Sequence, residues 1–269
     1  MSNMHPLRIS VIIPSFNHAK YLRLALASAL DQVGEFDLEV LVIDGGSNDG
    51  TVDLLQSFGT RVRWVSEPDG GQSDALNKGF RLATGDVLGW LNSDDLYQPG
   101  ALAVVANAFR SFPRVEWVHG RTDVIDPIGH VCRRWVSAYK RWLCQRYSYP
   151  RLLTENFIQP NTVFWRRELL SRVGDVDRTL HLAMDYDLWL RFARSTAPLY
   201  LDAPIACFRW YPTSKSGSRY VRQFREARAI ARRYEPDWRW AIRIGAIKAG
   251  FAIGCYKVAD LLGRSSPPA

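Results

Sequence analysis

The chain has 269 residues, of which 47% are hydrophobic and 23% charged. This balance excludes an intrinsically disordered protein and fits a globular chain with one large core or two modest lobes. The N-terminus lacks the pattern of a secretory signal and no apolar run reaches bilayer length, so we expect a cytoplasmic protein. The cysteines lie far apart without a CxxC pair, which argues against a zinc site or a disulfide framework.

The net charge of +8 comes almost entirely from one end of the chain. Residues 217–269 contain 11 Lys and Arg against 4 Asp and Glu, which is +7 of the total, so the remainder is close to neutral. A basic tail of this kind indicates a polyanionic partner, such as a membrane surface or a nucleic acid.

The first half of the chain alternates β-rich runs with helical patterns. We expect strands at 8–17, 38–44, 62–67 and 86–92, and helices at 18–32, from Thr51, and at 73–85. This alternation predicts an α/β fold: a Rossmann-like, mostly parallel central sheet flanked by helices. Ligands of such sheets bind at the carboxyl ends of the strands.

Beyond residue 113 the pattern changes. Segment 132–151 has six basic residues, no acid and five aromatics, while 184–194 predicts an amphipathic helix and 198–211 a further strand. The tail at 217–264 predicts two helices divided near Pro236, which would form a C-terminal helical extension.

Polar residues follow three of the expected strands. Singly, each group fits an ordinary turn, but together they converge on the edge of the sheet where a ligand would bind. An aspartate after the second strand can accept the imide N–H of uracil or a ribose hydroxyl, and adjacent acids offer oxygen ligands for Mg²⁺ or Mn²⁺. The three groups are Pro14-Ser15-Phe16-Asn17, Asp44-Gly45-Gly46-Ser47-Asn48-Asp49-Gly50 and Asn92-Ser93-Asp94-Asp95.

Four stretches resemble the successive signatures of glycosyltransferase family 2, the inverting enzymes with the GT-A fold. They are "SVIIPSFNHAKYLRLALASALDQ", "EVLVIDGGSNDGT", "GGQSDALNKGFRLATGDVLGWLNSDDLYQPGAL" and "MDYDLWLRFA". The resemblance covers residues 8–216 and implies a GT-A catalytic domain at 1–216. This domain would have a nucleotide-sugar-binding half at 1–112 and an acceptor-binding half at 113–216, followed by a basic helical tail at 217–269.

The resemblance also implies site residues. The nucleotide sugar would contact Pro14, Phe16, Asn17, Asp44, Asp74, Lys78, Asn92 and Asp94, and the metal, Mg²⁺ or Mn²⁺, would bind Asp95. The family's metal motif begins with an acid where this chain has Asn92. Asp185 matches the catalytic base, with Met184 in place of the family's glutamate, and "FRWYPTSKS" has Arg209 but Tyr211 where a histidine is common.

The implied reaction is the transfer of a sugar, with inversion, from a nucleotide diphosphate sugar, most simply a UDP-sugar. Asp185 would remove the proton of the attacking hydroxyl. The acceptor would be a glycan, or a glycan carried on a polyprenyl diphosphate, in cell-surface polysaccharide synthesis. The basic residues of 217–264 would then hold the enzyme on the inner face of the plasma membrane, with 132–151 near the acceptor.

Three other interpretations fit parts of the sequence. A nicotinamide oxidoreductase would need G-x-G-x-x-G after the first strand, where "PSFNHAKY" stands, and a sugar-nucleotide pyrophosphorylase would need a Gly-rich basic loop there. A catalytically inactive nucleotide-sugar or nucleic-acid binding protein would account for Asn92, Met184 and the arginine-rich tail. No nucleic-acid partner is expected, because any basic surface contacts phosphate.

Overall fold

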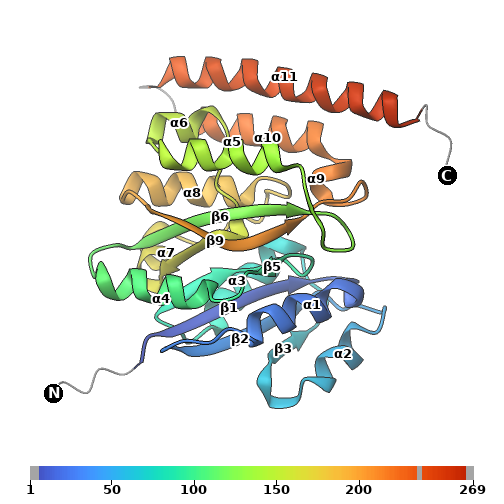
Figure 1. Ribbon diagram of the computed structural model, residues 1–269, viewed down its shortest axis with the longest axis vertical. Helices are drawn as coiled ribbons and strands as arrows, with labels where there is room; N and C mark the ends of the chain where they lie inside the picture. Colours follow the sequence, from blue (N-terminus) through green and yellow to red (C-terminus); the bar gives the residue numbers. More distant parts are fainter. Residues whose placement is uncertain (1–5, 235–237, 265–269) are drawn as a thin grey trace.

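The computed structural model describes residues 6–234 and 238–264, with side chains up to residue 254. A nine-stranded sheet forms the centre of the molecule, in the order β3-β2-β1-β4-β8-β6-β9-β5, with β7 paired to β6 (Figure 1). The strands are β1 (Arg8–Ser15), β2 (Asp37–Asp44), β3 (Arg63–Ser66), β4 (Val87–Trp90), β5 (Leu96–Tyr97), β6 (Trp117–Ile125), β7 (Val131–Cys132), β8 (Val163–Arg166) and β9 (Leu199–Arg209).

The sheet is mostly parallel. Strands β3, β2, β1 and β4 are joined by parallel pairings, and β6 pairs with β9 in parallel. Strand β8 runs antiparallel to both β4 and β6, so these two share one direction. The short strands β5 and β7 also run against their neighbours. The α/β fold class predicted from the sequence is therefore confirmed, and the antiparallel strands β5, β7 and β8 all lie within 96–166.

Helices cover both faces of this sheet. One face packs against α1, α2 and α4 and the other against α3, α7 and α8, because each helix buries one apolar side. Gly79 lets α3 lie close to β1, since an added Cβ there would be 2.4 Å from the Ile12 side chain. The helices are α1 (Ala19–Leu30), α2 (Thr51–Ser57), α3 (Gln72–Leu82), α4 (Ala101–Ser111), α5 (Arg134–Gln145), α6 (Tyr149–Thr154), α7 (Arg167–Val173), α8 (Met184–Ser195), α9 (Lys215–Ser218), α10 (Tyr220–Arg233) and α11 (Arg239–Arg264).

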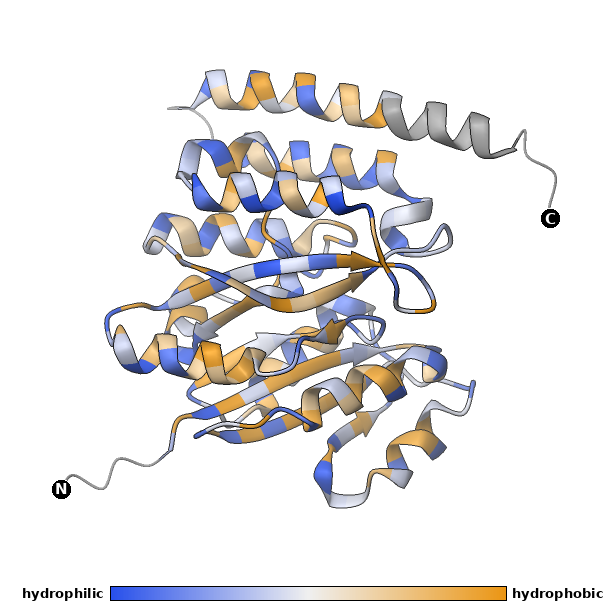
Figure 2. Cartoon of the chain, in the orientation of Figure 1, coloured by the Kyte–Doolittle hydropathy of each residue, from blue (hydrophilic) through white to orange (hydrophobic). Residues whose placement is uncertain are grey.

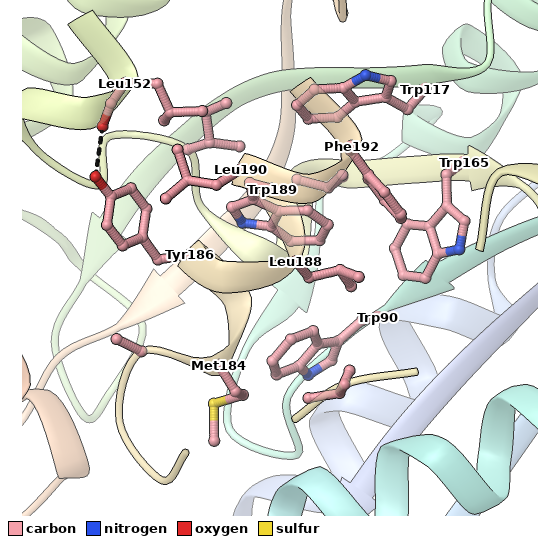
Figure 3. Packing of buried hydrophobic residues seen from close by; sticks show 14 of the residues in the cluster. Trp90, Trp117, Leu152, Trp165, Met184, Tyr186, Leu188, Trp189, Leu190 and Phe192 are labelled. Atoms are coloured by element: carbon pink, nitrogen blue, oxygen red, sulfur yellow. Dashed lines mark hydrogen bonds between the residues drawn. The ribbon is translucent and has the colours of Figure 1, made fainter. Parts of the chain in front are cut away.

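Aromatic rings fill the space between α8 and the sheet (Figure 3). Trp189 of α8 stacks on Trp117 of β6 with ring centroids 6.2 Å apart and meets Trp165 of β8 edge-on at 5.8 Å. Phe192 contacts all three tryptophans, and all four rings are fully buried. Rings of this size bury much apolar area in preferred tilted or offset geometries, so they hold the first turn of α8 at a fixed height above the sheet.

The C-terminal helices belong to the same core. Ile230 and Ala231 of α10, with Ala241 and Ile242 of α11, are buried in the cluster that contains Trp189. The outer side of α11 carries exposed hydrophobic residues beside polar ones (Figure 2). Both expected tail helices are present, while Pro236, expected to divide them, lies outside the described residues. No helix in the described part of the chain is long and apolar enough to cross a membrane.

The fold predicts a contrast between two isoleucines of the tail. Ile230 is fully buried, whereas Ile247 is 74% exposed. Ile230→Ala should lower the free energy of unfolding by about 2–5 kcal/mol, because it leaves a cavity in the shared core. The matched change Ile247→Ala should stay within about 0.5 kcal/mol of the wild type. Urea unfolding of both variants measures the difference, and equal small effects would mean that the tail contributes nothing to the core.

Candidate active site

The ends of β1 and β2 lie side by side, with Ser15 paired to Asp44. Asn17 adopts a positive φ of 53°, a conformation that asparagine tolerates better than most residues. Its N–H donates to Ser47 Oγ at 2.7 Å, and its Oδ1 accepts the N–H of Asn48 at 2.9 Å. Asn17 therefore joins the two strand-end loops, and the sequence prediction that polar strand ends meet at this edge is confirmed for β1 and β2.

A cleft of about 610 Å³ opens at this edge. Its walls come from the ends of β1 and β4, the start of α3, the loop before α8 and the segment after β9. Five of the residues predicted from the sequence line the cleft: Pro14, Phe16, Asn92, Asp94 and Asp185. Five other predicted residues do not line it: Asn17, Asp44, Asp74, Lys78 and the predicted metal ligand Asp95.

Asp44 is fully buried and its oxygens accept hydrogen bonds from within the chain. Oδ2 accepts from the N–H of Ser47 and the hydroxyl of Ser66, and Oδ1 accepts from the Ser47 hydroxyl. These bonds shape the turn after β2 rather than facing the cleft. The nucleotide role predicted for Asp44 thus stays a prediction, because a nucleotide would have to replace existing partners.

Asp74 and Lys78 of α3 also have partners in the chain. Asp74 pairs with Arg178 and accepts the N–H of Gly70, while Lys78 pairs with Glu67. Their predicted contacts with a nucleotide would therefore compete with these ion pairs.

Asp69 is a cleft residue that the sequence reasoning missed. It lines the cavity, and its Oδ1 accepts the N–H of Gly71 at 2.8 Å. Burial, helped by the neighbouring charge of Asp74, raises the pKa of its carboxyl. A Cβ at Gly45 would stand 3.0 Å from Asp69 Oδ2, so glycine at that position leaves room for this carboxylate. Two features of the sequence could have pointed to Asp69: the acid in "EPDGGQ" and the glycine directly after Asp44.

The segment after β4 presents one carboxylate to the cleft and buries the other. Asp94 lines the cavity and accepts the Tyr211 hydroxyl on Oδ2 at 2.9 Å; its Oδ1 has no partner among the described residues. Asp95 is fully buried, accepting the N–H of Arg209 on Oδ1 and the Asn92 amide on Oδ2. Burial and the adjacent Asp94 charge raise the pKa of Asp95 well above its usual range. Both oxygens of Asp95 thus have partners within the chain, and the metal role predicted for Asp95 stays a prediction.

Asn92 has a physical reason to be an amide. Its Oδ1 accepts from Trp90 Nε1 at 2.8 Å and from Gln72 Nε2 at 2.9 Å, and its Nδ2 donates to Asp95 at 3.0 Å. A carboxylate here would have no N–H to donate and would repel Asp95. The departure from the family's leading acid thus follows from the burial of Asp95.

A divalent cation would find few protein ligands here. Among the described residues no group of three or more His, Cys, Asp or Glu side chains is arranged to hold a metal. Mg²⁺ and similar ions, however, bind through one or two carboxylates plus substrate phosphates and water. The free Oδ1 of Asp94 fits that mode, with His18 and Tyr211 in the same wall.

Asp185 stands in the first turn of α8 and is the acid at the far side of the cleft. Its Oδ2 accepts the Asn156 amide at 3.0 Å, while Oδ1 has no partner among the described residues. Burial raises the pKa of Asp185 to about 6, against the lowering effects of Asn156 and Lys140. A carboxylate of this kind is deprotonated at neutral pH and has a free oxygen that can accept a proton.

Two neighbours of Asp185 have structural roles. Asp187 accepts Arg191 Nε at 2.9 Å and the Tyr234 hydroxyl at 3.2 Å, so its oxygens are occupied away from the cleft. Glu226 of α10 accepts the N–H groups of residues 181–183 on a single oxygen at 2.8–3.0 Å. This carboxylate holds the loop that leads into α8. The residue directly before Asp185 is Met184, which carries no carboxylate. Glu226 was not predicted, because nothing in the local sequence connects it to that loop.

Comparison with known proteins identifies the family. The family described as "Glycosyl transferase family 2" matches residues 10–170, more than half of the chain. The chain therefore belongs to glycosyl transferase family 2. It is 31% identical over 201 residues to an uncharacterized glycosyltransferase of Rickettsia typhi, covering 72% of this chain and 61% of the relative. It is 34% identical over 188 residues to a PGL/p-HBAD biosynthesis glycosyltransferase of Mycobacterium bovis, covering 68% of each.

Solved structures share the fold at low sequence identity. TarS 1–349 of S. aureus in complex with UDP superposes with a TM-score of 0.64 at 17% identity, covering 89% of this chain and 70% of that one. The mannosyltransferase PcManGT from Pyrobaculum calidifontis, in complex with GDP-Man and Mn²⁺, gives 0.61 at 20% identity, with 97% and 81% covered. The chain spans about three fifths of the length of the first Rickettsia relatives that it matches.

Proposed function

We propose that the protein transfers a sugar, with inversion, from a nucleotide diphosphate sugar to a hydroxyl of an acceptor. The observation that carries this proposal is the placement of Asp185, with one unpartnered oxygen, in the same cleft as the cleft-facing Asp94. An inactive binding protein would have no need of a buried carboxylate whose pKa lies just below neutrality. Family membership supports the same reaction.

The donor would lie along the ends of β1, β2 and β4, with its base beside Pro14 and Phe16. Phe16 is 60% exposed, which leaves its ring available to pack on a base. Asp69 lines this end of the cleft, and its Oδ2 has no hydrogen-bond partner among the described residues, so we assign Asp69 the imide N–H of uracil. A UDP-sugar donor is supported by related folds in complex with UDP and with UDP-GlcNAc.

The transfer follows from the positions of the two acids. Asp185 takes the proton of the acceptor hydroxyl as that oxygen attacks the anomeric carbon, and the nucleoside diphosphate leaves from the opposite face. A cation, Mg²⁺ or Mn²⁺, would offset the charge that gathers on the diphosphate. Asp94 would hold the cation with its carboxylate, and Tyr211 fixes that carboxylate by donating to Oδ2. Asp95 positions this segment from behind and does not touch the donor.

Removal of the base tests the reaction. Asp185→Asn should bind UDP normally but release diphosphate from its donor, in the presence of acceptor, about 10²–10⁴-fold more slowly. The wild-type rate should rise with pH through about 6 and then level, because only the deprotonated Asp185 accepts a proton. A nucleotide-sugar panel with Mn²⁺ identifies the donor, and Asp53→Asn, an exposed change on α2, is the control. Wild-type turnover by Asp185→Asn would place the base elsewhere.

The metal proposal separates two adjacent aspartates. Asp94→Asn should keep the wild-type unfolding free energy but lose the Mn²⁺-dependent gain in UDP affinity, since it removes the cleft-facing charge. Asp95→Asn should instead lower stability, because its N–H₂ would replace one of the two acceptor oxygens and face either Arg209 N–H or the Asn92 N–H₂. Calorimetric UDP titrations with Mn²⁺ and with chelator, alongside urea unfolding, measure both effects. Equal UDP affinity in chelator and in Mn²⁺ for the wild type would contradict the metal role.

We also propose that the acceptor is a glycan reached at a membrane surface, through an exposed face of α5 and α11. Trp135 and Trp142 of α5 are 72% and 45% exposed, and Ile247 and Phe251 of α11 are 74% and 76% exposed. The Tyr139 hydroxyl of α5 lies 3.5 Å from Lys248 Nζ of α11, so the two helices are neighbours. Aromatic and aliphatic side chains next to a tail of net charge +7 suit an anionic lipid surface.

The membrane proposal is tested with the intact chain. The wild type should float with vesicles that contain anionic lipid, and less so at high salt, because part of the affinity is electrostatic. The double change Ile247→Glu and Phe251→Glu should abolish flotation. Val33→Glu, an equally exposed site after α1 at 81%, should leave it unchanged. Recovery of all three proteins in the unbound fraction would exclude the membrane surface as a partner.

A further inference from the structure

A second cavity, of about 270 Å³, lies between α5 and the strands β6 and β9. The inner side of α5 supplies its basic residues, together with Ser137 and Cys144, and β6 supplies residues 120–123. Gln159 lines both this cavity and the cleft that contains Asp185. The two cavities are therefore adjacent.

The lining of this cavity carries an excess of positive charge: Arg121, Arg134, Lys140 and Arg141 face Asp123 as the opposing acid. Arg141 donates to both oxygens of Asp202 at 2.8 and 3.0 Å, and Arg121 lies 3.6 Å from the same carboxylate. Asp202 and Asp123 together offset two of the four positive charges, so the surroundings of the cavity keep an excess of positive charge. Cys144 adds no negative charge, because burial raises the pKa of its thiol to about 12.

The other two cations, Lys140 and Arg134, form no direct ion pair with a described residue. Across 6–234 and 238–254, neither Lys140 nor Arg134 has an ion-pair or side-chain hydrogen-bond partner, and burial lowers the pKa of Lys140. The Ser137 hydroxyl accepts the N–H of Val124 at 3.3 Å, which leaves its own hydrogen free to donate. An unpaired, partly buried ammonium is costly unless an anion meets it, so this arrangement indicates a site for a bound anion.

The charge of Lys140 also reaches the base. It is one of the influences that lower the pKa of Asp185, and the Asp185 charge acts on Lys140 in turn. An anion bound to Lys140 would therefore occupy a cavity adjacent to the cleft that contains Asp185. We propose that the second cavity binds a phosphate group of the acceptor, through Lys140, Arg134 and Ser137. This inference rests on the proposed transferase function and names the acceptor class.

A phosphate suits the site better than a carboxylate. A phosphate monoester carries close to two negative charges at neutral pH, which balances two unpaired cations. Its oxygens accept from an ammonium, a guanidinium and a hydroxyl at once. The same helix turns its exposed Trp135 and Trp142 outward, so α5 separates the cavity from the surface proposed to meet lipid. Two sources share this chemistry, a soluble sugar phosphate and a lipid-linked glycan, and binding experiments distinguish them.

The first test measures binding of inorganic phosphate to the full chain by calorimetry, with and without saturating UDP. Lys140→Gln should weaken phosphate at least fivefold, whereas Lys140→Arg, which keeps the charge, should weaken it less than twofold. Arg114→Gln removes an exposed cation elsewhere and should change nothing. UDP affinity is measured for each protein, so a failure of the proposed donor site is seen separately from a failure of the phosphate site.

The second test replaces inorganic phosphate with neutral vesicles that contain polyprenyl phosphate. If Lys140→Gln weakens the binding of both probes, the site accepts the phosphate of a soluble sugar phosphate as well as that of a lipid-linked acceptor. If it weakens the binding of the vesicles alone, the result supports the lipid-linked source. Unchanged affinity of Lys140→Gln for both probes would overturn the proposal, even where UDP binding and donor turnover are intact.

Discussion

The buried carboxylate of Asp95 is the constraint on which the candidate active site depends. It accepts the main-chain N–H of Arg209 at the end of β9 and the Asn92 amide after β4, so it joins two strand ends that lie far apart in the sequence. Arg209 then bonds to the carbonyls of Asp94, Asp126 and Pro127. A buried carboxyl group needs such hydrogen-bond partners, and these bonds hold Asp94 at the cleft wall.

The C-terminal extension takes part in the same architecture. Ile230 is buried beneath α8, and Glu226 binds the loop that leads into that helix. The extension thus supports Asp185 in two ways. It packs apolar residues against α8, and Glu226 accepts hydrogen bonds from the loop that leads into that helix. The outer side of α11 remains exposed and basic, so one helical extension can stabilise the catalytic domain and still present a surface to a partner.

Asp185 and Asp187 show how neighbouring acids of one helix differ in chemistry. Both are buried, yet Asp187 has Arg191 and Tyr234 as partners, whereas Asp185 has one amide and a free oxygen. The pKa of Asp185 rises to about 6 because burial outweighs the favourable contacts. The same comparison applies to Asp94 and Asp95, where burial separates a cleft-facing carboxylate from one that holds the backbone.

The sequence by itself determined the α/β class, the first four strands, the polar strand ends and Asp185, because these depend on periodicity and on motifs within a few residues. Only the tertiary structure decided which carboxylates face the cleft. Asp95 is turned inward by a strand more than a hundred residues away, and Asp69 and Glu226 gain their positions from distant loops. The cavity lined by Lys140 could not be predicted from the sequence either. Burial and partner choice are set by contacts between remote segments, and local pattern carries no record of them.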